Sequence, residues 1–380
     1  MNPIYLDHAA TTPVHPEVVQ AMLPILENVY GNPSSIHYFG RQARKILDEA
    51  RRTIASSINA QDKEIIFTAG GTEADNLAIL GVAKKYKHKG KHIITTSIEH
   101  HATLHTAEYL EKEGFEVTYL PVNENGQISI DDLEANLRDD TILVSIMYVN
   151  NETGVIQPIQ EIGFILENHQ ALFHTDAVQA YGVLPIDVQL LGVDLLSASA
   201  HKIYGPKGIG FLYAKEGIML EAMQHGGEQE RKRRAGTENT SAIAGFQKAV
   251  ELVMEERKKR METYVVYRKL FLDTLSDQGI QYEINGNPAI SIPSTINLSF
   301  PGTNVESLLT NFDLAGVAAS SGSACTAGSV DPSHVLSAMY GSDNERTKNS
   351  IRFSFGIANN EENIKEAALK VASIVKRLTN

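Results

Sequence analysis

The stretch VDLLSASAHKIYGPKGIG, residues 193–210, holds the pattern that decides the fold. An apolar run is followed by serine and alanine, then by His201 and Lys202, and then by a turn rich in glycine. A short apolar run bounded by turn residues predicts a buried strand, so the His-Lys pair is expected at its carboxyl end. The small residues before Lys202 leave space for a bulky group against its amine.

Similar apolar runs recur on either side of this stretch, separated by segments with helical periodicity. The further strand-like segments are 64–70, 91–97, 115–122, 141–149, 171–176 and 208–214. Near-continuous apolar strands with helices between them predict a mostly parallel sheet that is covered on both faces, here with seven strands.

This alternation stops after about residue 215, where a second region begins. A long charged helix is expected at about 240–275, followed by strands at 294–300, 316–322 and 350–356 and a final helix at 361–378. We therefore predict an α/β protein in two parts. The large cofactor-binding domain is residues 15–258, and the smaller α+β domain is residues 1–14 and 259–380.

Composition and charge exclude several classes of function. The chain has 380 residues and a net charge of −12, which argues against direct binding to nucleic acid. No apolar run approaches the roughly 20 residues of a membrane helix, and the N-terminus lacks the pattern of a signal peptide. A single cysteine rules out an internal disulfide framework and favours a reducing, cytoplasmic location.

Polar residues follow several of the predicted strands, at the edge where α/β sheets bind ligands. Gly71 and Thr72 open a helix and could receive a phosphate, although a plain N-cap explains the same residues equally well. No P-loop or dinucleotide-binding fingerprint accompanies them. His100, Asp176 and Lys202 follow other strands, so an acid, an imidazole and a lysine are expected on one rim.

These residue types together match the needs of pyridoxal 5′-phosphate (PLP). A lysine surrounded by small residues is desolvated, and its pKa falls towards what a Schiff base requires. PLP also needs an acid at its pyridine nitrogen, a ring over its face and N–H groups for its phosphate.

The chain resembles the fold-type-I, PLP-dependent cysteine desulfurases of the NifS/IscS type. The resemblance covers nearly the whole chain in order, through YLDHAATTP (5–13), GNPSSIHYFG (31–40), FTAGGTEADN (67–76), VNNETGV (149–155), HTDAVQAYG (174–182), SAHKIYGPKGIG (199–210) and SSGSACTAG (320–328). It implies conversion of L-cysteine to L-alanine, with the sulfur passing to an active-site cysteine as a persulfide for iron–sulfur cluster assembly or tRNA thiolation.

The resemblance also implies roles for individual residues around the cofactor. Lys202 would be the Schiff-base lysine, with Lys207 a structural neighbour. The other cofactor contacts would be His100 over the ring, Asp176 at the pyridine nitrogen, Gln179 near the ring hydroxyl, Gly71, Thr72, Ser199 and His201 at the phosphate, and Asn151. Thr237 would reach the phosphate of the other subunit's cofactor, which implies a homodimer.

Two further residues would act on the substrate and the sulfur. Arg352 has a planar guanidinium suited to clamp the substrate carboxylate, with Asn151 helping from the other side. Cys325 lies among Ser, Ala and Gly, which make a poor core, and it would carry the persulfide. The sulfur would then pass to an acceptor protein, for which an iron–sulfur scaffold, a tRNA-thiolating enzyme and a thiamine-pathway carrier all stay open.

Two alternatives compete with this interpretation. His101 and His105 are spaced for zinc on a helix beside His100, as in metal-dependent hydrolases, but this reading leaves Lys202, Asp176 and Cys325 without a role. We therefore expect no metal. The other alternative keeps PLP and changes the reaction to that of a selenocysteine lyase or a cysteine sulfinate desulfinase.

Overall fold

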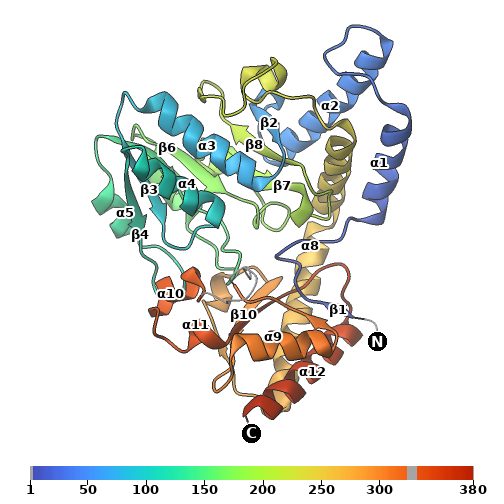
Figure 1. Cartoon of the computed structure of the whole chain (residues 1–380), viewed down its shortest axis with the longest axis vertical. Helices are drawn as coiled ribbons and strands as arrows, with labels where there is room; N and C mark the ends of the chain where they lie inside the picture. The colour runs from blue at the N-terminus through green and yellow to red at the C-terminus, as the bar shows by residue number, and fades with distance from the viewer. Residues whose placement is uncertain (1–2, 323–331, 380) are drawn as a thin grey trace.

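The computed structural model describes residues 3–322 and 332–379. In this part of the chain a large helix-covered sheet lies above a smaller α+β layer, and one long helix runs through both (Figure 1). The helices are α1 (Pro16–Asn28), α2 (Tyr38–Ser57), α3 (Gly71–Tyr86), α4 (His101–Lys112), α5 (Ile130–Asn136), α6 (Ile159–Leu166), α7 (Val188–Leu191), α8 (Thr240–Asp277), α9 (Val305–Leu314), α10 (His334–Tyr340), α11 (Arg346–Asn349) and α12 (Glu361–Thr379).

The large sheet has seven strands within the described residues, which confirms the predicted architecture. Its strands are β2 (Ile65–Thr68), β3 (His92–Thr96), β4 (Glu116–Leu120), β5 (Thr141–Ser145), β6 (Leu172–Asp176), β7 (Leu195–Ser199) and β8 (Gly210–Ala214), in the order β2-β8-β7-β6-β5-β3-β4. The pairs from β7 to β4 are parallel, whereas β8 runs antiparallel to both of its neighbours.

Helices cover both faces of this sheet because its strands are apolar on both sides. One core cluster joins the sheet to α2, α6 and α8, and another joins its opposite face to α3 and α4. The strands are fully buried in β2, β3, β5, β7 and β8. Polar side chains that follow them are therefore directed to the edge where the strands end.

The smaller layer is built on short strands. β10 (Thr295–Ser299) pairs antiparallel with β12 (Ser350–Ser354) and with β9 (Glu283–Ile284), while β1 (Ile4–Tyr5) pairs parallel with β11 (Val317–Ala318). The strand predicted over 316–322 is thus wrong in its length. In the described residues 319–322, the pairing is reduced to an isolated bridge between Ser320 and Arg352.

Helix α8 is continuous for 38 residues and contributes to both cores. Its side chains up to Val253 belong to the large core, and those from Tyr264 onward belong to the small one. The division of the chain at residue 258 stays a prediction, since helix α8 runs unbroken across that residue. No helix among the described residues has the length and apolar character needed to cross a membrane.

Candidate active site

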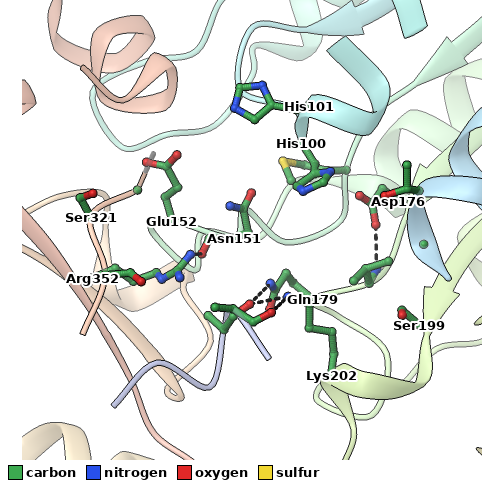
Figure 2. A pocket seen from close by; sticks show the side chains of 18 of the residues that line it. His100, His101, Asn151, Glu152, Asp176, Gln179, Ser199, Lys202, Ser321 and Arg352 are labelled. Carbon is green, nitrogen blue, oxygen red and sulfur yellow. Dashed lines mark hydrogen bonds between the residues drawn. The ribbon is translucent and has the colours of Figure 1, made fainter. Parts of the chain in front are cut away.

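A cavity of about 550 Å³ opens between the large sheet and the smaller layer. Asp176 and Ser199 end β6 and β7, and Arg352 reaches the cavity from β12 (Figure 2). The predicted site residues that line it are Gly71, Thr72, His100, Asn151, Asp176, Gln179, Ser199, His201, Lys202 and Arg352. Residues from opposite ends of the sequence therefore share one cavity.

One end of the cavity is shaped by the start of α3. Gly70, its N-cap, has φ 157° and ψ −174°, a backbone conformation that is essentially reserved for glycine. A Cβ atom on Gly71 would lie 2.7 Å from Val178 Cγ2 and 3.8 Å from Ser199 Cβ, so only glycine leaves this space open. The first turn of a helix has N–H groups without intrahelical partners, and these can receive an anion.

Lys202 lies in a 3₁₀ turn, Ala200–Lys202, that directly follows β7. Its Nζ donates to the carbonyl oxygens of Ala9 and Ala10, at 2.5 and 2.8 Å. Burial, together with the positive charge of Arg352, lowers the pKa of Lys202 to about 8. The amine is thus closer to its neutral, nucleophilic form than an exposed lysine is.

Asp176 and His100 face the same cavity from neighbouring segments (Figure 2). Burial raises the pKa of Asp176 to about 6, against the lowering effect of the Val178 N–H, which donates to Oδ1 at 2.8 Å. Burial and the charge of Lys202 lower the pKa of His100 to about 4. The N–H of Ala102 donates to His100 Nδ1 at 3.1 Å, so the neutral ring carries its proton on Nε2.

Arg352 is held at the opposite side of the cavity by two acceptors. Its Nη2 donates to Asp7 Oδ1 at 2.8 Å, and its Nη1 donates to the carbonyl oxygen of Asn151 at 3.0 Å. Its Nε and the Oδ1 of Asn151 are buried atoms that lack hydrogen-bond partners among the described residues. Two buried polar atoms without partners at a cavity wall leave room for a polar ligand.

Two of the residues named from the sequence lie outside the cavity, and a third is not described. Thr237 is exposed and does not line the cavity, and Lys207 is exposed in the turn after Lys202. Cys325 lies outside the described residues, so its predicted role stays a prediction.

Sequence reasoning missed the contribution of the N-terminal segment. This segment contacts Lys202 and Arg352. In addition, the Gln179 side-chain N–H donates to the carbonyl oxygen of Ala9 at 2.9 Å. Its Thr11 hydroxyl lies 3.1 Å from His201 Nδ1. The motif YLDHAATTP was the available signal. Several of its contacts are made by backbone carbonyl groups, which every residue type has, so the sequence does not reveal them.

Two buried acids at the cavity also escaped prediction. Asp75 and Glu152 are each 1% exposed and line its wall. The histidines considered for zinc lie close to one another, with ring centroids of His101 and His105 4.9 Å apart. Among the described residues, no three or more His, Cys, Asp or Glu side chains are grouped so that they could hold a metal ion.

Comparisons with known proteins place this fold and cavity in a family. The chain matches the aminotransferase class-V family over residues 4–366 and belongs to it. The IscS 1 protein of Bacillus subtilis (strain 168) is 58% identical and is covered over 100% of both chains. The cysteine desulfurase IscS of Dictyoglomus turgidum (strain DSM 6724 / Z-1310) is 48% identical, over 99% of this chain and 95% of that one.

A solved structure titled as a NifS-like protein gives a TM-score of 0.92 at 35% identity, covering 99% of this chain and 100% of the other. Within the class-V aminotransferases, the chain is thus a member of the cysteine desulfurases of the NifS/IscS type. The family that the sequence motifs indicated is confirmed.

Proposed function

We propose that this protein is a PLP-dependent cysteine desulfurase that converts L-cysteine to L-alanine and carries the released sulfur on Cys325. The observation that carries the proposal is that a lysine with a lowered pKa and a buried arginine line one cavity of a NifS/IscS-type chain. We place the reaction in the cytoplasm, where a reducing environment keeps a lone catalytic thiol free.

The residues of the cavity fit PLP. The space kept open by Gly71 at the start of α3 suits a phosphate, with Thr72, Ser199 and His201 as further donors. Lys202 would hold the cofactor covalently, and the remaining contacts would come from Asp176 at the ring nitrogen, Gln179 at the ring hydroxyl, His100 over the ring and Asn151. When bound, PLP withdraws electrons from the bonds at the α-carbon of an amino acid.

The substrate would be oriented by Arg352. Arg352 lines the cavity and its Nε has no hydrogen-bond partner among the described residues, so a substrate carboxylate would supply one. Asn151 would add a contact through its side chain, whose Oδ1 is likewise without a partner. A charged guanidinium–carboxylate contact is stronger than a neutral hydrogen bond. The Arg352 end of the cavity would therefore select amino acids by their carboxylate.

Protons would be moved by Lys202 and His100. With its lowered pKa, Lys202 can accept a proton near neutral pH and return it. His100 is neutral there, and its Nε2–H is the free side of the ring because Nδ1 is occupied by the Ala102 N–H.

The sulfur transfer needs a thiolate on Cys325. That thiolate would attack the sulfur of the substrate, forming an S–S bond while the substrate C–S bond breaks. The carbon gains a proton, so that one thiol and L-cysteine give one persulfide and L-alanine. No external oxidant is required, because the thiol sulfur is oxidised as the substrate carbon is reduced.

We further infer that the protein is a homodimer. Thr237 is exposed and lies away from its own cavity, which suits a contact with the cofactor of a second copy. The loop between α1 and α2 projects from the body and carries Tyr30 and Ile36, which are 76% and 91% exposed (Figure 1). Large apolar side chains gathered at such a projection are typical of an interface.

A sulfur-acceptor protein would receive the persulfide sulfur. An iron–sulfur scaffold, a tRNA-thiolating enzyme and a thiamine-pathway carrier all fit the chemistry, and none requires direct contact of this chain with nucleic acid. A pull-down with the Cys325 persulfide trapped, followed by identification of the bound protein, distinguishes them.

The deciding experiment compares wild type with Cys325→Ser. Both should bind L-cysteine and change the absorbance of the cofactor, because binding depends on Lys202 and Arg352. The variant should release no sulfide in the presence of dithiothreitol, since a serine hydroxyl does not replace a thiolate near neutral pH. Equal turnover of L-cysteine by both proteins would contradict the proposal. It would favour a selenocysteine lyase or a sulfinate desulfinase, whose leaving groups depart without attack by a thiolate.

A further inference from the structure

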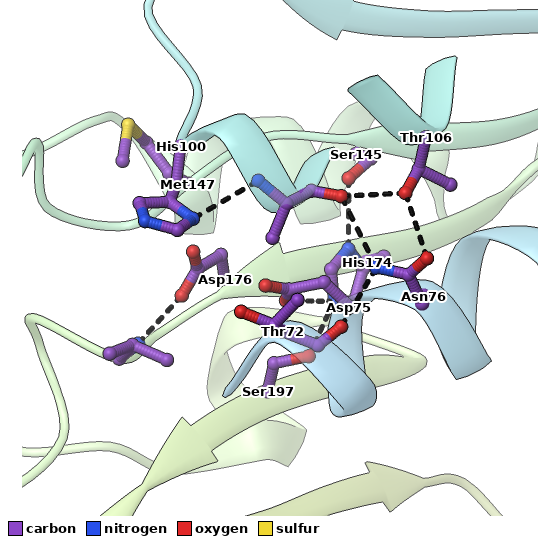
Figure 3. A network of polar contacts seen from close by, with 12 residues as sticks. Thr72, Asp75, Asn76, His100, Thr106, Ser145, Met147, His174, Asp176 and Ser197 are labelled. Atoms are coloured by element: carbon purple, nitrogen blue, oxygen red, sulfur yellow. Dashed lines mark hydrogen bonds and ion pairs between the residues drawn. The ribbon is translucent and has the colours of Figure 1, made fainter. Parts of the chain in front are cut away.

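A chain of buried polar side chains lies beside Asp176 (Figure 3). His174 is 0% exposed, and its Nδ1 lies 2.8 Å from the hydroxyl of Ser145. Its Nε2 lies 3.0 Å from the hydroxyl of Ser197 and 3.7 Å from Oδ1 of Asp75. The proposed reaction uses none of these groups.

The fold couples this chain to Asp176. His174 and Asp176 are alternate residues of β6, so their side chains lie on the same face of the sheet. Ser197 is the residue of β7 that pairs with Asp176. Asp75 comes from α3, which covers this face. Asp75 and Asp176 are the aspartates among the buried residues of the described part of the chain.

When two buried carboxyl groups interact electrostatically, the ionisation of one raises the pKa of the other, so both are rarely ionised together. Burial raises the pKa of Asp75 well above its ordinary value, and the negative charges of Asp176 and Glu99 raise it further, while Ser197 lowers it. His174 gives no balancing positive charge, because burial lowers its pKa to about 3. Among the described residues Asp75 Oδ1 has no hydrogen-bond partner, which is costly for an ionised carboxylate.

Asp176 is placed differently. The Val178 N–H donates to it, and the positive charge of Lys202 lowers its pKa, so that burial raises that pKa only to about 6. Glu99 is buried as well, and burial raises its pKa to about 8. Near neutral pH, the negative charge of this group of acids is therefore concentrated on Asp176.

We propose that Asp75 is a positioning residue that stays protonated and, lying beside His174 and Ser197, keeps Asp176 as the anion of the buried pair. A neutral Asp75 adds no negative charge that would favour protonation of Asp176. The hydroxyls of Ser145 and Ser197 hold the neutral His174 ring in place beside it. The importance of Asp176 for the reaction rests on the proposed function, whereas the protonation of Asp75 does not.

The first test uses the cofactor-free protein labelled with ¹³C in its aspartate carboxyls. The infrared spectrum of wild type at neutral pH should contain a carboxylic-acid C=O band that shifts with the label, which separates it from the buried glutamates. The band should disappear in Asp75→Asn and persist in Asp176→Asn. Its absence from wild type, or its loss in Asp176→Asn alone, would overturn the proposal.

The second test measures unfolding by urea as a function of pH. The pKa of Asp75 is raised in the folded state, so its favourable contribution is complete at acid pH and is lost as the pH rises from about 4, the ordinary value for aspartate. The folding equilibrium constant of Asp75→Asn relative to wild type should rise about tenfold per pH unit from there to the folded-state pKa. A ratio that does not change with pH would contradict the proposal.

Both tests read the protein without its cofactor, so their outcome is independent of whether the chain desulfurates cysteine. If Asp75→Asn does not fold, the spectra of labelled wild type and Asp176→Asn still decide the question, because Asp75 and Asp176 are the buried aspartates in the described part of the chain.

Discussion

Asp7 holds two groups that lie more than 300 residues away from it in sequence. Its Oδ1 accepts from Arg352 Nη2 and its Oδ2 accepts from the Ser320 hydroxyl, both at 2.8 Å. The side chain of Arg352 is 6% exposed and that of Asp7 is 17% exposed, so solvent screens this ion pair only weakly. The N-terminal segment thus fixes the guanidinium that we propose binds the substrate.

The pair should show energetic coupling in a double-mutant cycle. Asp7→Asn, Arg352→Gln and the double variant are unfolded with urea in the cofactor-free state. Because each single change leaves a largely buried charge without its partner, we expect a coupling energy of about 1–3 kcal/mol. Asp140→Asn with its exposed partner Arg138 is the matched control, and it should give well under about 1 kcal/mol. If the effects of Asp7→Asn and Arg352→Gln on the free energy of unfolding were strictly additive, the contact would contribute nothing to stability.

The same two residues should shift the pKa of Lys202 in opposite directions. The positive charge of Arg352 lowers this pKa and the negative charge of Asp7 raises it. In wild type, the rate of covalent attachment of PLP should rise with pH and level off above about 8, where the amine is neutral. The midpoint should move up in Arg352→Gln and down in Asp7→Asn. Shifts of the same sign in both variants would contradict this account.

Lys202, not Lys207, should carry the cofactor. Reduction with borohydride and peptide mapping should place the pyridoxyl group on Lys202. Lys202→Ala should lose covalent PLP, while Lys207→Ala should keep it because Lys207 is exposed and lies outside the cavity. A pyridoxyl group on any other lysine would make the central assignment wrong.

The space at Gly71 offers a test of the phosphate site. Gly71→Ala should weaken PLP binding by at least tenfold, or about 1.4 kcal/mol, because its Cβ would lie 2.7 Å from Val178 Cγ2. Adding Val178→Ala removes that contact and should restore part of the affinity. The dissociation constant is measured by absorbance titration of the cofactor-free protein. Equal affinity in wild type and Gly71→Ala would place the phosphate elsewhere.

The proposed interface can be tested at Ile36 and Tyr30. Aspartate at either position should disfavour burial of the loop between α1 and α2, and sedimentation should then show monomers where wild type gives dimers. Phe164→Asp is the control, since Phe164 is 78% exposed on α6, away from this loop. Dimers of unchanged stability in the Ile36 and Tyr30 variants would place the interface on another face.

Much of this fold could be predicted from the sequence because its strands are apolar on both faces. Each buried run of the large sheet has the composition that predicts a strand in a helix-covered sheet. The antiparallel direction of β8 was not visible, since the glycine-rich turn after Lys202 sets it and periodicity carries no direction. The strand expected at 316–322 was too long, because β11 ends at Ala318 and the Ala, Ser and Gly residues that follow it have little tendency to form strands.

The position of Lys202, Asp176 and Arg352 in one cavity could be predicted because each residue type has a specific chemistry, whereas their roles stay predictions. The site was not predictable where the contact is a backbone carbonyl, as at Ala9 and Ala10, or where an ordinary aspartate meets its partner only in the folded chain, as at Asp7. Asp75 belongs to the second kind, because on sequence alone it is one more polar residue near the start of a helix.

The N-terminal segment has a consequence for synthesis on the ribosome. β1 pairs with β11, Asp7 forms a bridge with Ser354, and the Ala9 N–H donates to the Ser354 hydroxyl across 345 positions. Contacts of such long sequence separation form late, because the intervening chain must first be brought together. In a nascent chain, Ala9 therefore leaves the ribosome 345 residues before Ser354 and waits for β12 to follow. Until then, the segment whose carbonyl oxygens accept from Lys202 lacks its hydrogen bond to the last strand of the small sheet among the described residues.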